Sequence, residues 1–72
     1  MSKIVDARGL SCPQPVLLTL NEMKKINKGE ITVLVDTDTS KENVSRAANV
    51  QGWQIKSIES EGIGYRITVS KG

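Results

Sequence analysis

A chain of 72 residues is long enough for a single small domain, which we expect to span residues 1–72. Ten Lys and Arg residues against eight Asp and Glu residues give a net charge of +2, a bias too small to indicate binding to nucleic acid or to a membrane. The absence of His excludes an imidazole base, and the single Cys excludes both an internal disulfide and an all-cysteine metal site. We therefore expect no metal and no cofactor. A lone thiol in a chain without an apolar run of about 18 residues is typical of a cytoplasmic protein.

The first half of the chain predicts a strand, a loop and a helix. Residues 3–6 are predicted as a short strand, and residues 7–12 as a loop. The helix opens with Pro13 and Pro15, which are tolerated in a first helical turn because the N–H groups there have no intrahelical partner. Gly29 is predicted as its left-handed cap. Apolar residues spaced three and four apart give this helix one apolar face: Val16, Leu17, Leu20, Met23 and Ile26.

The middle of the chain predicts a strand followed by a second helix. Residues 30–36 alternate between two faces, which is typical of a strand. Thr39, with Glu42 three residues later, has the spacing of a capping box, so the second helix is predicted to begin there and to end before Gly52.

The last third of the chain predicts two more strands. The third is expected over residues 53–59, with Trp53 in the core, and the fourth from Tyr65 onward, after a turn over residues 61–64. The order βαβαββ predicts an α/β (α+β) two-layer sandwich: a four-stranded mixed sheet with two helices on one face.

Cys12 is the residue with the clearest chemical potential. It is predicted at the N-cap of the first helix, where free N–H donors and the positive end of the helix dipole favour an anion. The pKa of its thiol is therefore expected below the usual value of about 8.5. Pro13 and Pro15 carry no N–H group and hold this corner rigid, which leaves Gln14 and Val16 to donate near the sulfur.

Arg8, four residues before Cys12, is expected to add a positive charge near the thiol. The alternative is that Cys12 only fills a core, as single cysteines often do. The polar neighbours Ser11 and Gln14 favour a reactive, partly exposed thiol.

The segment of residues 6–15, Asp-Ala-Arg-Gly-Leu-Ser-Cys-Pro-Gln-Pro, resembles the D-x-x-G-L-x-C-P-x-P signature of the TusA-like (SirA-like) sulfur-carrier family. The βαβαββ order and the closing Tyr65-Arg66-Ile67 strand are also similar to that family. Residues 35–36 and 41–44 look more like the amino-terminal domain of its YedF-type members. The resemblance implies that Cys12 accepts persulfide sulfur from a cysteine desulfurase and passes it to an acceptor protein. The purpose would be tRNA thiolation, molybdenum cofactor assembly or related sulfur metabolism.

The site implied by this resemblance consists of Cys12 as the persulfide carrier, with Pro13, Gln14, Pro15 and Arg8 in supporting roles. Without a His or a second Cys, the chain cannot complete a thioredoxin-like cycle. We therefore expect a sulfurtransferase-type carrier rather than a complete stand-alone enzyme.

Two other functions remain open at this point. One is a YedF-like selenium or redox accessory domain. The other is a non-catalytic RNA- or protein-binding module, because the layered fold resembles the carboxyl-terminal domain of bacterial translation initiation factor three. We do not expect direct nucleic-acid binding, since the chain has only two aromatic residues for base stacking.

Three carboxylates are predicted at the ends of strands, where ligand sites of α/β folds gather. Asp6 is expected to organise its own turn, and Asp36 and Asp38 to cap the second helix. Leu10 is the apolar residue best placed to be exposed for a partner, because its loop has little core to enter.

Overall fold

The computed structural model describes residues 2–10, 14–26 and 28–72. These residues form, in order, β1 (Ser2–Asp6), α1 (Gln14–Ile26), β2 (Gly29–Val35), α2 (Asp38–Val50), β3 (Gln54–Glu61) and β4 (Gly64–Lys71). The predicted βαβαββ order is confirmed. Neither helix, as far as the chain is described, is long and apolar enough to span a bilayer.

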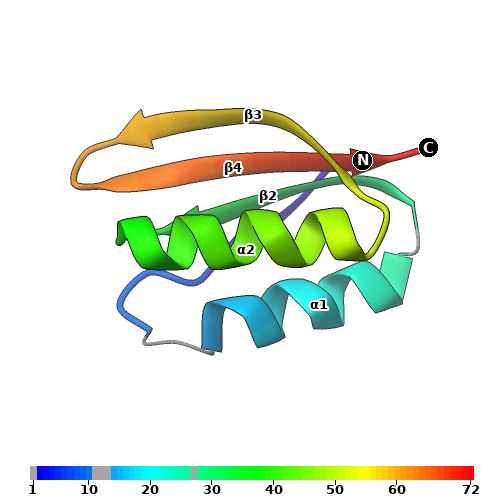
Figure 1. Ribbon diagram of the computed structural model, residues 1–72, viewed down its shortest axis with the longest axis horizontal. Coiled ribbons are helices and arrows are strands. Elements are labelled where there is room, and N and C mark those ends of the chain that lie inside the picture. The colour runs from blue at the N-terminus through cyan, green and yellow to red at the C-terminus, as the bar shows by residue number, and fades with distance from the viewer. Residues whose placement is uncertain (1, 11–13, 27) are drawn as a thin grey trace.

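The four strands form one mixed sheet in the order β1-β2-β4-β3. β1 pairs with β2 in parallel, whereas β4 pairs antiparallel with both β2 and β3. Both helices cover the same face of this sheet, as Figure 1 shows. The predicted two-layer sandwich is therefore confirmed.

The core lies between the sheet and the two helices. Alternate residues of β2 point into it, because successive side chains of a strand face opposite sides of a sheet. Ile31, Val33 and Val35 are all fully buried. Trp53 is 2% exposed and belongs to this core, as predicted. Its backbone N–H donates to the carbonyl of Ala48 at 2.9 Å. The branched aliphatic residues of the strands therefore form the centre of the core, and Trp53 closes it beside the end of α2.

The sheet has two distinct ends. β1 and β2 run in the same direction, so Asp6 at the end of β1 and Asp36 directly after β2 lie at the same end of the sheet. At the other end Lys71 pairs with Gly29, next to the start of β1, so both chain termini lie there (Figure 1). The loop after β1 and the two termini are thus on opposite ends of the molecule.

The start of α2 differs from the prediction. The N-cap is Thr37, whose side-chain oxygen accepts from the N–H of Ser40 at 3.1 Å. The capping box proposed at Thr39 is therefore wrong. The earlier start adds Ser40 to the buried face of the helix, four residues before Val44, and places the acidic Asp38 in the first turn, where the dipole favours it.

The turn between the last two strands is shorter than predicted. β3 continues to Glu61 and β4 begins at Gly64, so two residues connect them rather than four. Gly62 has a φ of +61°, the left-handed conformation that a two-residue hairpin loop requires. Ile63 at its tip is 93% exposed.

Gly64 lies against the end of β2. A Cβ atom at this position would be 2.2 Å from the carbonyl oxygen of Val35 and 3.0 Å from Cα of Asp36. Both contacts are with backbone, so the strands would have to separate. Glycine at this position therefore allows β4 to reach the point where the chain leaves β2.

We predict that Gly64→Ala lowers the free energy of unfolding by about 2–3 kcal/mol, as expected for overpacking against backbone. Urea denaturation of the variant and the wild type measures the difference. Gly72→Ala is the matched control, because nothing lies within 4 Å of a Cβ there, and it should leave stability unchanged. Equal stability of Gly64→Ala and the wild type would contradict the close approach.

Candidate functional site

Cys12 and Pro13 lie outside the described residues. The structure describes the segments that precede and follow them in the chain. Residues 7–10 approach it from β1, and α1 leaves it at Gln14. The first turn of α1 contains no acidic residue, so no carboxylate there offsets the positive end of the helix dipole. The described start of α1 is thus electrostatically favourable for an anion.

Two backbone donors hold the loop after β1 in place. The N–H of Ala7 donates to the carbonyl of Leu34 at 2.8 Å, which extends the pairing of β1 with β2 by one residue. The N–H of Gly9 then donates to Oδ2 of Asp36, also at 2.8 Å. Gly9 has a φ of +77°, which explains the need for glycine at this turn. The chain is therefore anchored three residues before Cys12.

The carboxylate of Asp6 organises the same loop. It accepts from the backbone N–H of Arg8 at 3.1 Å, and from Nε and Nη2 of the Arg8 guanidinium at 3.0 and 2.9 Å. These hydrogen bonds, first from the side chain and then from the backbone of Arg8, lower the pKa of Asp6 to about 2. The expectation that Asp6 organises its turn is confirmed.

The pairing with Asp6 also bears on the role expected of Arg8. Both groups are about half exposed, and the guanidinium uses two of its donors on this carboxylate. Asp6 therefore offsets much of the positive charge of Arg8. An influence of Arg8 on the thiol of Cys12 stays a prediction.

Gln14 and Pro15 lie on different sides of α1. Gln14 is exposed, whereas Pro15 is among the fully buried side chains. The hydroxyl of buried Thr19 donates to the carbonyl of Pro15 at 2.8 Å. The second proline of the motif is thus a core residue as well as part of the helix start, which its sequence pattern alone did not indicate.

Asp36 does not cap α2 as expected, because Thr37 fills that position. It anchors Gly9 instead. The parallel pairing of β1 with β2 could have indicated this contact with Gly9, because it brings together the residues that follow the two strands. Sequence reasoning placed Asp6 and Asp36 each at the end of a strand and gave Asp6 its task correctly, but it did not identify the task of Asp36.

Asp38 is not the N-cap of α2 either; it lies in the first turn of that helix and connects it to β4. It accepts a hydrogen bond from the Tyr65 hydroxyl, which raises the pKa of that phenol. Lys41 lies 4.5 Å from the centroid of the Tyr65 ring and 3.9 Å from the Asp38 carboxylate. This cluster fixes the start of α2 beside the candidate site.

Leu10 is 37% exposed, in agreement with its expected availability to a partner. Within residues 2–10, 14–26 and 28–72, no group of three His, Cys, Asp or Glu side chains is arranged to hold a metal ion.

We predict that Asp36→Ala speeds hydrogen exchange of the Gly9 amide by about fivefold, since an exposed hydrogen bond to a carboxylate contributes roughly 1 kcal/mol. Residue-resolved NMR measures the exchange. Asp38→Ala is the matched control, because it removes a carboxylate two residues away that does not contact Gly9 and should leave this amide protected. Unchanged exchange in Asp36→Ala would show that the bond does not hold the loop.

We predict that Arg8→Gln returns the pKa of Asp6 from about 2 toward its ordinary 3.8, because the hydrogen bonds from the Arg8 guanidinium, which contribute most to the shift, are lost. A lowered carboxyl pKa stabilises the folded protein above the unfolded-state value near 3.8, and this stabilisation is lost as the pH falls toward 2. Carboxyl-carbon NMR across this window gives the pKa. Lys3→Gln is the control, because it removes a cation from the same strand as Asp6, and it should leave the pKa of Asp6 unchanged. A pKa of Asp6 near 3.8 in the wild type would contradict its pairing with Arg8.

Comparison with known families shows a match along nearly the whole chain. The model of the family described as "Sulfurtransferase TusA" matches residues 3–71. A crystal structure of a SirA-like protein from Desulfitobacterium hafniense superposes with a TM-score of 0.88 at 31% sequence identity, and the match covers 100% of this chain and 99% of that one. Sequence and fold thus agree.

Individual relatives differ in length. "Putative sulfur carrier protein MJ0990" of Methanocaldococcus jannaschii is 33% identical over 96% of this chain and 93% of its own. "Putative sulfur carrier protein YrkF" of Bacillus subtilis is also 33% identical over 96% of this chain, but the match spans 38% of that protein. "Uncharacterized protein MJ0760" of M. jannaschii is 30% identical, and there the match spans 26%. On the match over residues 3–71, the chain belongs to the TusA sulfurtransferase family.

Proposed function

We propose that this protein is a sulfur carrier that holds sulfur as a persulfide on Cys12. It accepts the sulfur from a cysteine desulfurase and delivers it to an acceptor protein. The observation that carries the proposal is the family match, which runs through the residues on both sides of Cys12. Two relatives that are named as sulfur carrier proteins support the same role.

The described flanks of Cys12 support a thiol that is held in place and activated. The Gly9–Asp36 hydrogen bond fixes the chain before it, and buried Pro15 fixes the chain after it. A helix start without a carboxylate in its first turn favours the thiolate, and it favours the persulfide anion in the same way.

The transfer we propose needs no external oxidant. The Cys12 thiolate attacks the terminal sulfur of the desulfurase persulfide, a new S–S bond forms on Cys12, and the donor S–S bond breaks to release the donor thiolate. Delivery is the same exchange in the other direction. A cysteine thiolate of the acceptor attacks the terminal sulfur, a new S–S bond forms on the acceptor, and the Cys12 thiolate is the leaving group. One S–S bond is exchanged in each step.

Both steps require partner proteins. The chain has neither a His to act as base nor a second Cys to resolve the persulfide. We place this exchange in the cytoplasm, where reducing conditions keep a lone thiol free. Sulfur delivered in this way would serve tRNA thiolation, cofactor assembly or a related pathway.

We predict that Cys12→Ser abolishes sulfur uptake without unfolding the protein. Serine is among the favoured N-cap residues, so α1 should form as before, but its hydroxyl cannot form a persulfide. The assay incubates each protein with a cysteine desulfurase and cysteine, and intact-mass spectrometry detects the added sulfur. Circular dichroism checks the fold.

Ser11→Ala is the matched control, since it changes the neighbouring residue and keeps the thiol, and it should take up one sulfur as the wild type does. Absence of a desulfurase-dependent mass gain on the wild type would contradict the carrier function. A gain that appears only when selenocysteine replaces cysteine as the substrate of the desulfurase would instead support the selenium accessory domain.

A further inference from the structure

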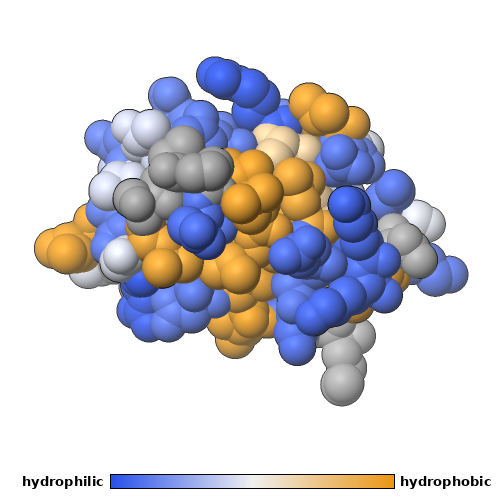
Figure 2. Space-filling model, turned by 90° about the horizontal axis from the view of Figure 1, so that it is seen from below, coloured by the Kyte–Doolittle hydropathy of each residue, from blue (hydrophilic) through white to orange (hydrophobic). Residues whose placement is uncertain are grey.

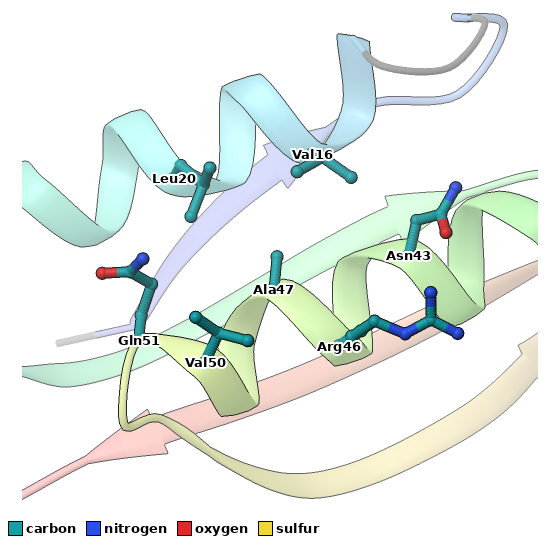
Figure 3. Close-up of a pocket in the computed structure, with 7 residues that line it drawn as sticks. All are labelled: Val16, Leu20, Asn43, Arg46, Ala47, Val50 and Gln51. Carbon is teal, nitrogen blue, oxygen red and sulfur yellow. The ribbon is translucent and has the colours of Figure 1, made fainter.

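An apolar groove runs between the two helices. It has a volume of about 430 Å³, and its apolar lining comes from Val16 and Leu20 of α1 and from Ala47 and Val50 of α2. Figure 3 shows these side chains directed toward the space between the helices. Because Val50 is 75% exposed, much of this apolar surface lies open to solvent.

The groove is part of a larger apolar band on the helix-covered face of the molecule. Figure 2 shows hydrophobic atoms gathered across the middle of this face, with hydrophilic atoms on both sides. Leu17, one residue after Val16 on α1, is 48% exposed. An apolar surface of this kind, rimmed by polar residues, is typical of an interaction site.

The charged residues that line this groove and the hollow next to it are all cationic. Arg46 lines the groove, and this second hollow of about 100 Å³, which shares Gln51 with the groove, is lined by Lys24 and Lys71. No Asp or Glu lines either hollow. Among the described residues, none of the three cations makes an ion pair. Lys71 donates a hydrogen bond to the carbonyl of Gln51, so Arg46 and Lys24 are the cations available to a partner.

We propose that this groove binds an acidic amphipathic helix of a partner protein. The apolar face of that helix would cover Val16, Leu20, Ala47 and Val50, and carboxylates on its edges would pair with Arg46 and Lys24. Helices that insert an apolar face into a groove are a recurrent mode of recognition. The acidic edges follow from Arg46, which lines the groove, and from Lys24, which lines the adjacent hollow.

The length of the groove suits a short helical segment. Its lining on α2 runs from Asn43 to Gln51, which corresponds to about 12 Å of helix. That is roughly two turns of a partner helix. The two helices already lie side by side, so a third would extend the helical layer.

A second copy of this chain fits the groove poorly. In a two-fold symmetric dimer each surface meets its own equivalent, so Arg46 and Lys24 would face cations of the same set. RNA is also disfavoured, because the groove floor is aliphatic. Trp53, the aromatic residue that lines the second hollow, is 2% exposed and cannot stack on bases.

The groove begins close to the candidate site. Val16 lies two residues after the described start of α1, and Asn43 lies opposite it at the same end (Figure 3). A helix bound here would bring its protein next to the segment that carries Cys12. If the protein has the function proposed above, this partner is a sulfur donor or acceptor. That identification rests on the proposed function, whereas the binding of an acidic helix does not.

The test uses designed peptides and the Cys12→Ser protein, which cannot carry sulfur. One peptide is a helix of about three turns with Leu along one face and Glu on both edges, and its twin has Lys in place of every Glu. NMR titration of the labelled protein follows the amides. We expect the acidic peptide to shift Val16, Leu20, Ala47 and Val50, and the Lys twin to bind at least about tenfold more weakly.

Two pairs of variants localise the binding. Arg46→Glu should weaken binding of the acidic peptide by about fivefold. Arg66→Glu makes the same charge change on the sheet face that the helices do not cover, and it should leave binding unchanged. Val50→Ser should also weaken it, and Ile4→Ser should not, although Ile4 is an equally accessible apolar residue at 66% exposure.

Several results would overturn the inference. These are equal binding of the two peptides, shifts confined to the outer sheet face, a groove-mediated dimer, or shifts at the groove with a single-stranded RNA but not with the acidic peptide. Because Cys12→Ser carries no sulfur, the peptide result is independent of the sulfur-uptake assay. Failure of the inference and failure of the proposed function are therefore distinguishable.

Discussion

The hydrogen bond from Gly9 to the carboxylate of Asp36 ties the loop that leads to the candidate site to the sheet. It links the loop after β1 to the first residue beyond β2, across a sequence separation of 27 residues. The parallel pairing of β1 and β2 makes this bond possible, and the close approach of Gly64 to Val35 and Asp36 keeps the acceptor where it is. The position of the loop that leads to Cys12 therefore depends on the sheet rather than on the loop itself.

On its other side the motif depends on the core. Pro15 is fully buried, and its carbonyl accepts from the buried Thr19 hydroxyl. A change in the packing of α1 against the sheet would therefore move the start of the helix as well. In the sequence, Cys12 thus lies between two anchored segments, the loop at Gly9 and the start of α1 at Pro15, and Gln14 at the start of that helix is exposed.

Sequence patterns identified the elements of this fold because they depend on local periodicity and on glycine and proline. They failed where two local signals competed. Thr37 and Thr39 can each cap a helix, and the structure uses Thr37, with Ser40 among the buried residues of the helix. Asp36 could be placed at the correct edge but not given its partner, because a bond to Gly9 depends on strand register. The groove between α1 and α2 was not predicted, since it arises from the spacing of two separately amphipathic helices.

The location of the two termini has a consequence for longer members of the family. Both leave from the end of the sheet opposite to the loop that precedes Cys12 (Figure 1). Additional domains joined at either terminus of this fold would start on that far side and leave the approach to the motif open. The fold can therefore act as one module in a larger polypeptide, which agrees with relatives in which the matching region makes up 38% and 26% of the protein.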